Sequence, residues 1–178
     1  MSLWLIGAAM PFKFCAKAPF QRVVDIAGED GLEIVWNELR AFEKYSEWNT
    51  FTTRVAPKEL PVKAGTRASL DVTMMRPFSD KATSTMLGLE FQFRNIEEKK
   101  RICWSYNLVP PSLQWLTLST YRCMEMRLGA EGYAEVCHFD ENMGPLAPVI
   151  QLFFQRSIEE GFRRMNADLK LRVATRNL

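Results

Sequence analysis

The sequence predicts one α+β domain in which a curved antiparallel sheet of about seven strands wraps around a long C-terminal helix, with one or two short helices after the first strand. Between residues 51 and 139, apolar and polar residues alternate in stretches separated by Pro and Gly, the pattern of half-buried strands. Residues 149–178 contain no Pro and a single Gly, Gly161. Their apolar residues recur three or four positions apart and share one stripe of a helix: Phe154, Ile158, Phe162, Met165, Leu169 and Val173. Such a stripe needs a cover, which the upstream strands can supply.

The length and charge of the chain fit one domain without a nucleic-acid partner. The chain has 178 residues and a net charge of +2, from 23 basic and 21 acidic residues that are interleaved along it. We expect residues 1–17 to form an N-terminal extension and residues 18–178 to form the domain. The apolar run at the start is much shorter than the roughly 20 residues that cross a bilayer, so no transmembrane segment is predicted. The sequence leaves the oligomeric state open.

Four cysteines with irregular spacing indicate buried free thiols in a reducing compartment, and we therefore predict a cytoplasmic location. Cys103, Cys123 and Cys137 fall in three successive predicted strands. Two of them could become neighbours, which leaves a disulfide or a metal site as the alternative.

The elements follow the order strand, short helices, six strands and long helix. Residues 20–26 are predicted to form the first strand. Asp30 and Glu33 have the spacing of a capping box, which predicts a helix that starts there, followed by a short helix or turn over 46–50. The later strands are predicted at 51–56, 67–75, 85–96, 101–108, 115–128 and 133–139. Because their connections are short, consecutive strands pair antiparallel as a meander.

A sheet that wraps around a helix about 10 Å wide leaves space at one end, so we expect an apolar cavity between them. Alternation predicts the inward residues, although a shift of one position would reverse them: Leu70, Val72, Leu87, Leu89, Phe91, Phe93, Ile102, Trp104, Tyr106, Met124, Met126 and Leu128. Arg122 and Arg127 are expected to face solvent, or else to meet an acidic ligand headgroup.

The residues predicted to line the cavity are large aromatic, Met and Leu side chains: Trp48, Leu89, Phe91, Trp104, Tyr106, Met124, Met126, Phe162, Met165 and Leu169. Aromatic and thioether side chains suit irregular apolar ligands, and they also fill plain cores. On the long helix, we expect Phe162, Met165 and Leu169 to form the floor of the cavity. Phe153, Phe154 and Ile158 are expected to hold the helix against the sheet.

Candidates for proton transfer are few. His138 is the only histidine, and no spacing of Cys or carboxylates supplies the remaining ligands of a metal site. His138 and Asp140 could share one face of a strand, which gives a carboxylate-oriented imidazole able to act as a general base. The structural alternative is a strand-end histidine with satisfied hydrogen bonds. Tyr106 is the third candidate. Nucleophile and phosphate-loop motifs are absent from the sequence, and no cofactor is predicted.

Three segments carry a resemblance to a known superfamily. Residues 35–51 (VWNELRAFEKYSEWNTF), 137–148 (CHFDENMGPLAP) and 162–170 (FRRMNADLK) resemble segments of the SRPBCC, or START-like, superfamily, in its polyketide cyclase/dehydrase-like branch. They occur in the same order as in that family and cover about residues 20 to 175. The chain departs from the pattern at Thr50, where relatives have Pro, and at Asp140, where many have Glu.

The resemblance implies the helix-grip fold, in which a curved sheet grips a long C-terminal helix around an apolar pocket. The expected function is the binding or carriage of a small hydrophobic ligand such as a lipid, isoprenoid, sterol or polyketide-like compound. One alternative is a cyclase or dehydratase that uses His138, Asp140 or Tyr106 in the cavity. A protein-interaction module is the other alternative.

Overall fold

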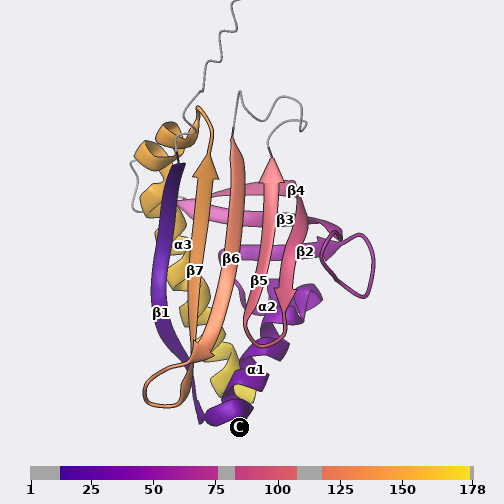
Figure 1. Cartoon of the computed structure of the whole chain (residues 1–178), viewed down its shortest axis with the longest axis vertical. Helices are drawn as coiled ribbons and strands as arrows, with labels where there is room; N and C mark the ends of the chain where they lie inside the picture. Colours follow the sequence, from indigo (N-terminus) through magenta and orange to yellow (C-terminus); the bar gives the residue numbers. More distant parts are fainter. Residues whose placement is uncertain (1–12, 76–82, 108–117, 177–178) are drawn as a thin grey trace, which may run out of the picture.

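A computed structural model describes residues 13–75, 83–107 and 118–176, which form a seven-stranded antiparallel sheet in the order β1-β7-β6-β5-β4-β3-β2. Figure 1 shows the sheet curving around α3, with α1 and α2 at the end near the C-terminus. The elements are β1 (Lys13–Ala27), α1 (Gly28–Arg40), η1 (Phe42–Lys44), α2 (Tyr45–Trp48), β2 (Thr52–Pro57), β3 (Arg67–Met75), β4 (Thr83–Glu97), β5 (Arg101–Asn107), β6 (Ser119–Leu128), β7 (Tyr133–Met143) and α3 (Ala147–Arg176). The predicted fold class is confirmed.

The first strand is longer than the sequence predicts. β1 starts at Lys13 rather than at residue 20, and the pairs from Lys13 with Met143 to Lys17 with Phe139 tie this stretch to β7. Residues 13–17 therefore belong to the sheet, whereas the sequence places them in the extension. Alternation is present there, but it is carried by Ala and Lys, which are weak strand formers. Residues 1–12 and the predicted strand start at 115 lie outside the described residues.

The predicted capping box is wrong. α1 starts at Gly28, after Ala27, which makes no side-chain cap, so Asp30 already lies inside the first turn. The backbone N–H of Gly28 donates to the carbonyl of Gly132 at 2.7 Å. Glu33 pairs instead with Lys99, at 2.5 Å between carboxylate oxygen and ammonium nitrogen. Contacts with the β6–β7 turn and the β4–β5 turn thus replace the local cap.

The lone glycine of α3 lets the helix approach the sheet side of the core closely. A Cβ atom at Gly161 would lie 2.3 Å from Cε2 of Phe51. The Phe51 ring occupies that space and meets Phe162 edge-on, with ring centroids 5.7 Å apart. Farther along α3, Arg172 Nε binds a carboxylate oxygen of the buried Glu38 at 3.3 Å, which fixes the helix against α1.

A bulge in β4 changes which residues face the helix. Leu70 pairs with Leu89, but Val72 pairs with Met86, so β4 carries one extra residue. Gly88 adopts a φ of +66°, and its N–H donates to Asp71 Oδ1 at 2.7 Å.

The bulge also corrects the predicted orientation of one leucine. Leu87 was predicted to point inward, but it is 74% exposed, because the extra residue reverses the alternation there. Leu128, also predicted inward, is exposed where β6 ends.

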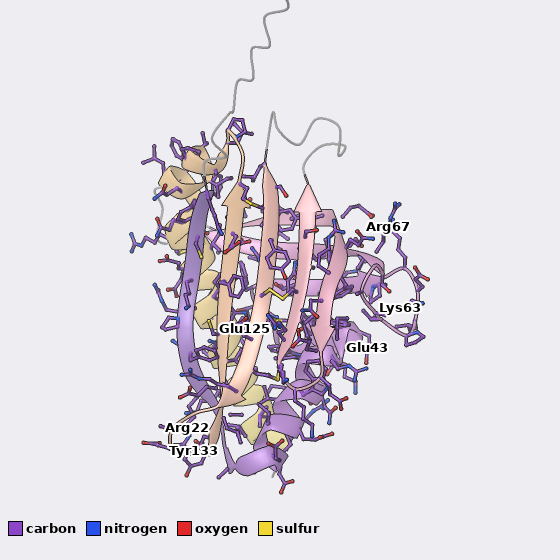
Figure 2. The ribbon with its side chains drawn as sticks, viewed as in Figure 1. Arg22, Glu43, Lys63, Arg67, Glu125 and Tyr133 are labelled. Atoms are coloured by element: carbon purple, nitrogen blue, oxygen red, sulfur yellow. A yellow bond between two sulfur atoms is a disulfide. The ribbon has the colours of Figure 1, made fainter. Side chains whose placement is uncertain are left out.

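The prediction that all four cysteines are free thiols is wrong for two of them. Cys103 and Cys123 lie opposite each other on β5 and β6, with Cα atoms 4.2 Å apart, and form a disulfide (Figure 2). Direct cross-strand partners are close enough for such a bond. Cys15 and Cys137 are free.

Among the residues that the structure describes, none of the helices combines the length and the apolar character that a membrane span requires.

Candidate functional site

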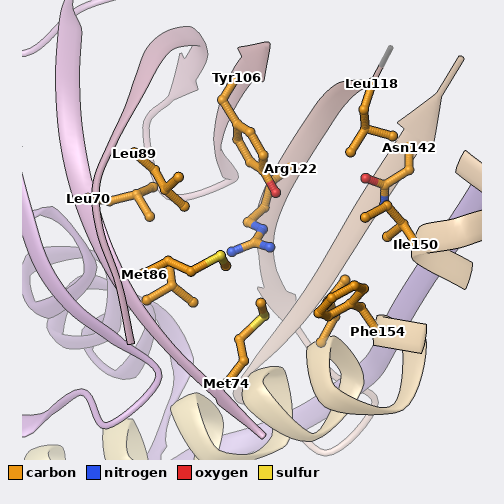
Figure 3. A pocket seen from close by; sticks show the side chains of 12 residues that line it. Leu70, Met74, Met86, Leu89, Tyr106, Leu118, Arg122, Asn142, Ile150 and Phe154 are labelled. Atoms are coloured by element: carbon orange, nitrogen blue, oxygen red, sulfur yellow. The ribbon is translucent and has the colours of Figure 1, made fainter. Parts of the chain in front are cut away.

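A partly open cavity of about 120 Å³ lies between the first half of α3 and the concave face of β3 to β7 (Figure 3). Nine of its twelve lining residues are apolar: Leu70, Val72, Met74, Met86, Leu89, Leu118, Ile150, Phe154 and Ile158. The other three are Tyr106, Arg122 and Asn142. The cavity is thus an apolar chamber with a polar inner wall.

Two local features shape the apolar walls. The β4 bulge turns both Met86 and Leu89 toward the cavity, although they are three residues apart. On α3, Ile150, Phe154 and Ile158 recur every four residues, which places them on one face.

Two hydrogen bonds hold α3 at the end of β3. The hydroxyl of Ser157 donates to the carbonyl of Met75 at 3.0 Å, and Arg164 Nη2 donates to the carbonyl of Thr73 at 2.8 Å. The helix is therefore fixed beside the cavity by backbone acceptors of the sheet.

Two of the ten predicted lining residues, Leu89 and Tyr106, line this cavity. The others pack in the main core instead: Trp48, Phe91, Trp104, Met124, Met126, Phe162, Met165 and Leu169. Aromatic rings fill that end of the sheet, with the Phe91 centroid 5.0 Å from that of Phe93 and 5.7 Å from that of Trp104.

The cavity lies against the half of α3 that the sequence assigns to packing, not against the half predicted to form its floor. Phe154 and Ile158 line the cavity, whereas Phe162, Met165 and Leu169 pack in the core. The stripe is apolar along its whole length, so the sequence does not mark where the facing sheet runs out of large side chains.

Arg122 is the main functional candidate for which the favoured prediction is wrong. The sequence predicts that it faces solvent, or else meets an acidic ligand headgroup; it is 4% exposed and lines the cavity, so it does not face solvent. Alternation carried the signal, because Arg122 has the same parity on its strand as the inward Met124 and Met126. The charge of the guanidinium outweighed that signal. Asn142 was missed because the predicted strand ended at residue 139, whereas β7 extends to Met143.

Arg122 forms a buried ion pair with Asp140, with Nη2 2.7 Å from Oδ2. The guanidinium also lies over two rings, 5.4 Å from the centroid of Phe51 and 5.2 Å from that of Phe162. Burial raises the pKa of Asp140, and the charge of Arg122 opposes that shift. The charge of Arg122 in the cavity wall is thus compensated by a buried carboxylate that does not itself line the cavity.

A second polar row lies beside the ion pair. The hydroxyl of Thr120 donates to Asn142 Oδ1 at 2.8 Å, and Thr120 lies opposite Tyr106 in the pairing of β5 with β6. Burial, together with the charge of Asp140, raises the pKa of Tyr106 to about 12, so its phenol stays protonated. Tyr106 is thus a neutral hydrogen-bonding group near neutral pH.

His138 and Asp140 do not pair with each other as the sequence predicted. His138 Nε2 lies 2.8 Å from Asn166 Oδ1, and its ring stacks on Phe162 with centroids 5.3 Å apart. Burial lowers the pKa of His138 to about 4. Neither His138 nor Asp140 lines the cavity, so Tyr106 alone of the three proton-transfer candidates can touch a molecule inside it.

A second hollow, of about 640 Å³, lies on the outside of the molecule beside the end of α1 and the chain after β2. Its walls include Arg40, Glu43 and Leu60, and Leu60 is 82% exposed. A solvated surface hollow of this kind excludes less water than the cavity beneath α3, which is therefore the better candidate site.

Within the part of the chain that the structure describes, no three His, Cys, Asp or Glu side chains gather closely enough to hold a metal ion.

Comparisons with known proteins identify the fold and no family. No family model matches the sequence, and no curated protein matches it. Among solved structures, the hypothetical protein jhp0584 from Helicobacter pylori matches with a TM-score of 0.63 and 11% identity over 94% of this chain and 91% of that one. Ara h 8.0201 matches with a TM-score of 0.56 and 10% identity over 93% and 99% of the two chains. The protein of unknown function SA2116 from Staphylococcus aureus matches with a TM-score of 0.56 and 9% identity, over 94% of this chain and 96% of that one. The chain therefore shares the helix-grip fold with these structures.

Proposed function

We propose that this chain binds a small hydrophobic molecule, or one end of a longer apolar chain, in the cavity between α3 and the sheet. The observation that supports this most is the composition of the walls, in which nine of twelve lining residues are apolar. Burial of apolar ligand surface there would contribute about 2.5 kcal/mol for every 100 Å² removed from water. The two ends of the helix–sheet interface have different roles: one end is packed as core, and the other holds the ligand.

The size of the cavity restricts the ligand class. Its volume of about 120 Å³ is close to that of engineered cavities of about 150 Å³ that take up benzene. A sterol is several times larger than benzene and has rigid fused rings. Of the classes that the sequence predicts, we therefore favour a lipid or an isoprenoid that inserts the end of its chain, over a sterol; a short aliphatic compound would also fit.

Thermal unfolding with benzene as the probe tests this proposal. A ligand at about 100 times its Kd stabilises a protein by about 2.7 kcal/mol. For a domain of this size, that corresponds to a rise of roughly 5–10 °C in Tm. The informative variant is Ile150→Trp, which places a large ring in the cavity wall. Val149→Trp is its matched control, because Val149 is the next residue on α3, is 45% exposed and does not line the cavity.

Wild type and Val149→Trp are expected to gain the same Tm shift, and Ile150→Trp to lose it. Native mass spectrometry followed by solvent extraction should recover a bound apolar compound from the wild type and from Val149→Trp only. Equal shifts in all three proteins, or no shift in any of them, would refute the proposal.

The predicted cytoplasmic location stays a prediction, and the Cys103–Cys123 disulfide weighs against it. Disulfides persist mainly in oxidising compartments. Alkylation under denaturing, non-reducing conditions, as the protein is taken from its native cells, tests the location, because the buried Cys137 reacts only in the unfolded chain. Alkylation of all four cysteines supports the cytoplasm, whereas modification of Cys15 and Cys137 alone supports an oxidising compartment.

A further inference from the structure

Two rows of inward residues cross β5, β6 and β7 at the inner wall of the cavity. In the first row, Thr120 pairs with Tyr106 on one side and with Asn142 on the other. In the second row, Arg122 pairs with Asp140 across β6 and β7. Figure 3 shows Tyr106 and the Arg122 guanidinium directed toward the centre of the cavity.

Two buried donors of this wall are unused. Asn142 Nδ2 and Arg122 Nε have no hydrogen-bond partner among the described residues. Both side chains line the cavity, and they are 1% and 4% exposed. A buried donor without an acceptor is costly, so this wall favours a ligand that brings an acceptor atom.

The charge balance of the wall selects against anionic ligands. Arg122 is already compensated by Asp140 at 2.7 Å. A carboxylate placed beside that pair would add an uncompensated charge to a buried apolar site, which is unfavourable. A neutral acceptor needs no such compensation.

The wall can serve a carbonyl or a hydroxyl group of a ligand. Tyr106 lines the cavity, and a neutral phenol both donates and accepts hydrogen bonds. A ligand oxygen can accept from Asn142, and a ligand hydroxyl can donate to the phenol oxygen of Tyr106.

We infer that the ligand is a neutral, mainly aliphatic molecule with an acceptor oxygen, in a carbonyl or hydroxyl group, which accepts a hydrogen bond from Asn142 Nδ2. This inference rests on the proposed function, since it specifies the ligand of the same cavity. Aldehydes, ketones, esters and alcohols share this chemistry, with the apolar part of the ligand lying against Met74, Met86 and Phe154.

Four six-carbon probes separate the alternatives on the wild-type protein: hexane, 2-hexanone, 2-hexanol and hexanoate. At pH 7.4, 2-hexanone and 2-hexanol are each expected to bind at least tenfold more tightly than hexanoate, because both are neutral and carry an acceptor oxygen. The infrared carbonyl band of bound 2-hexanone should lie below its position in hexane solution, because hydrogen bonds weaken the C=O bond. This readout needs no variant.

Asn142→Leu removes one donor at nearly constant volume. It is expected to weaken 2-hexanone about fivefold or more, the effect of losing one hydrogen bond, and to leave hexane within twofold of its wild-type Kd. Hexane is the matched control, because it has no acceptor.

The outcomes distinguish the inference from the proposed function. If hexane binds but the ketone band stays at its position in hexane, or if hexanoate binds as well as 2-hexanone, the inference of a neutral acceptor oxygen is wrong and the cavity function stands. If neither hexane nor benzene binds, the cavity function itself fails and the acceptor inference fails with it.

Discussion

Arg122 brings a positive charge into the wall of a mainly apolar cavity, and Asp140, which does not line the cavity, compensates that charge; both side chains are almost fully buried. A side chain with a formal charge is predicted to face solvent from sequence alone, which is why Arg122 was misplaced although the strand period placed it inward. The partner could not be predicted either, because Asp140 lies eighteen residues away and meets Arg122 only through the β6–β7 register.

Replacing Arg122 with Met is expected to lower the free energy of unfolding by about 3–5 kcal/mol, because Asp140 would remain buried and unpaired. The matched control is Arg127→Met on the same strand. Arg127 pairs with Glu135 at 3.0 Å, but its side chain is 57% exposed, and exposed pairs contribute at most about 1 kcal/mol. Urea unfolding measures both changes. Equal losses in the two variants would contradict the buried pair.

Protonation of His138 gives the fold a predictable acid sensitivity. Burial lowers its pKa to about 4, from an ordinary value of 6.5. The unfolded chain therefore binds a proton on His138 between pH 6.5 and pH 4, while the folded protein does not. The contribution of neutral His138 to the free energy of unfolding is fully present above pH 6.5 and is lost as the pH falls toward 4. The loss amounts to about 2 kcal/mol between pH 7.5 and pH 5.

Urea titrations of the wild type and of His138→Gln at both pH values isolate this effect. Asp140 titrates in the opposite sense, because burial raises its pKa, but it is present in both proteins and cancels in the difference. The wild type should lose about 2 kcal/mol more than the variant on acidification. The same pH dependence in both proteins would show that His138 is not buried in its neutral form.

At the scale of elements, the sequence predicted well whatever depends on local periodicity. The 3.6-residue stripe predicted α3, and period-two alternation predicted the bounds of β3. Features that depend on contacts distant in the sequence were missed, including the uncapped start of α1 and the β4 bulge at Gly88. A bulge adds one residue without a strong compositional mark. A prediction by alternation therefore continues through the bulge unchanged, whereas in the structure the side chains beyond it point to the opposite faces.

The contact of α3 with Phe51 predicts that replacing Gly161 with Ala destabilises the fold, although Gly-to-Ala changes inside helices usually stabilise it. Replacing an interior helical Gly with Ala normally stabilises by about 1 kcal/mol. At Gly161 the new Cβ would lie 2.3 Å from the Phe51 ring, so we expect Gly161→Ala to destabilise by about 1–3 kcal/mol. Denaturant unfolding of Gly161→Ala, alone and combined with Phe51→Leu, measures it. A stabilised single variant, or a double variant whose losses simply add, would contradict the contact.

At the scale of the whole molecule, the sequence predicted a sheet around a helix and a cavity between them, but it placed the cavity at the wrong end. Both ends of the α3 stripe are apolar, so the difference lies in the facing strands. The rings of Phe91, Phe93 and Trp104 fill the space on one side. Smaller aliphatic and thioether side chains on the other side leave about 120 Å³ unfilled. Such a volume difference depends on how strands curve, which a linear pattern does not record.

Methyl NMR of the full chain with labelled methionines tests the central claim most directly, because methionines occur at both ends of the helix–sheet interface. Met74 and Met86 line the cavity, whereas Met124 and Met165 are buried in the core. During titration with hexane, the signals of Met74 and Met86 should shift and saturate while those of Met124 and Met165 stay in place. Saturable shifts at Met124 and Met165 alone, or no saturable shift at any methionine, would contradict the claim that this cavity is the ligand site.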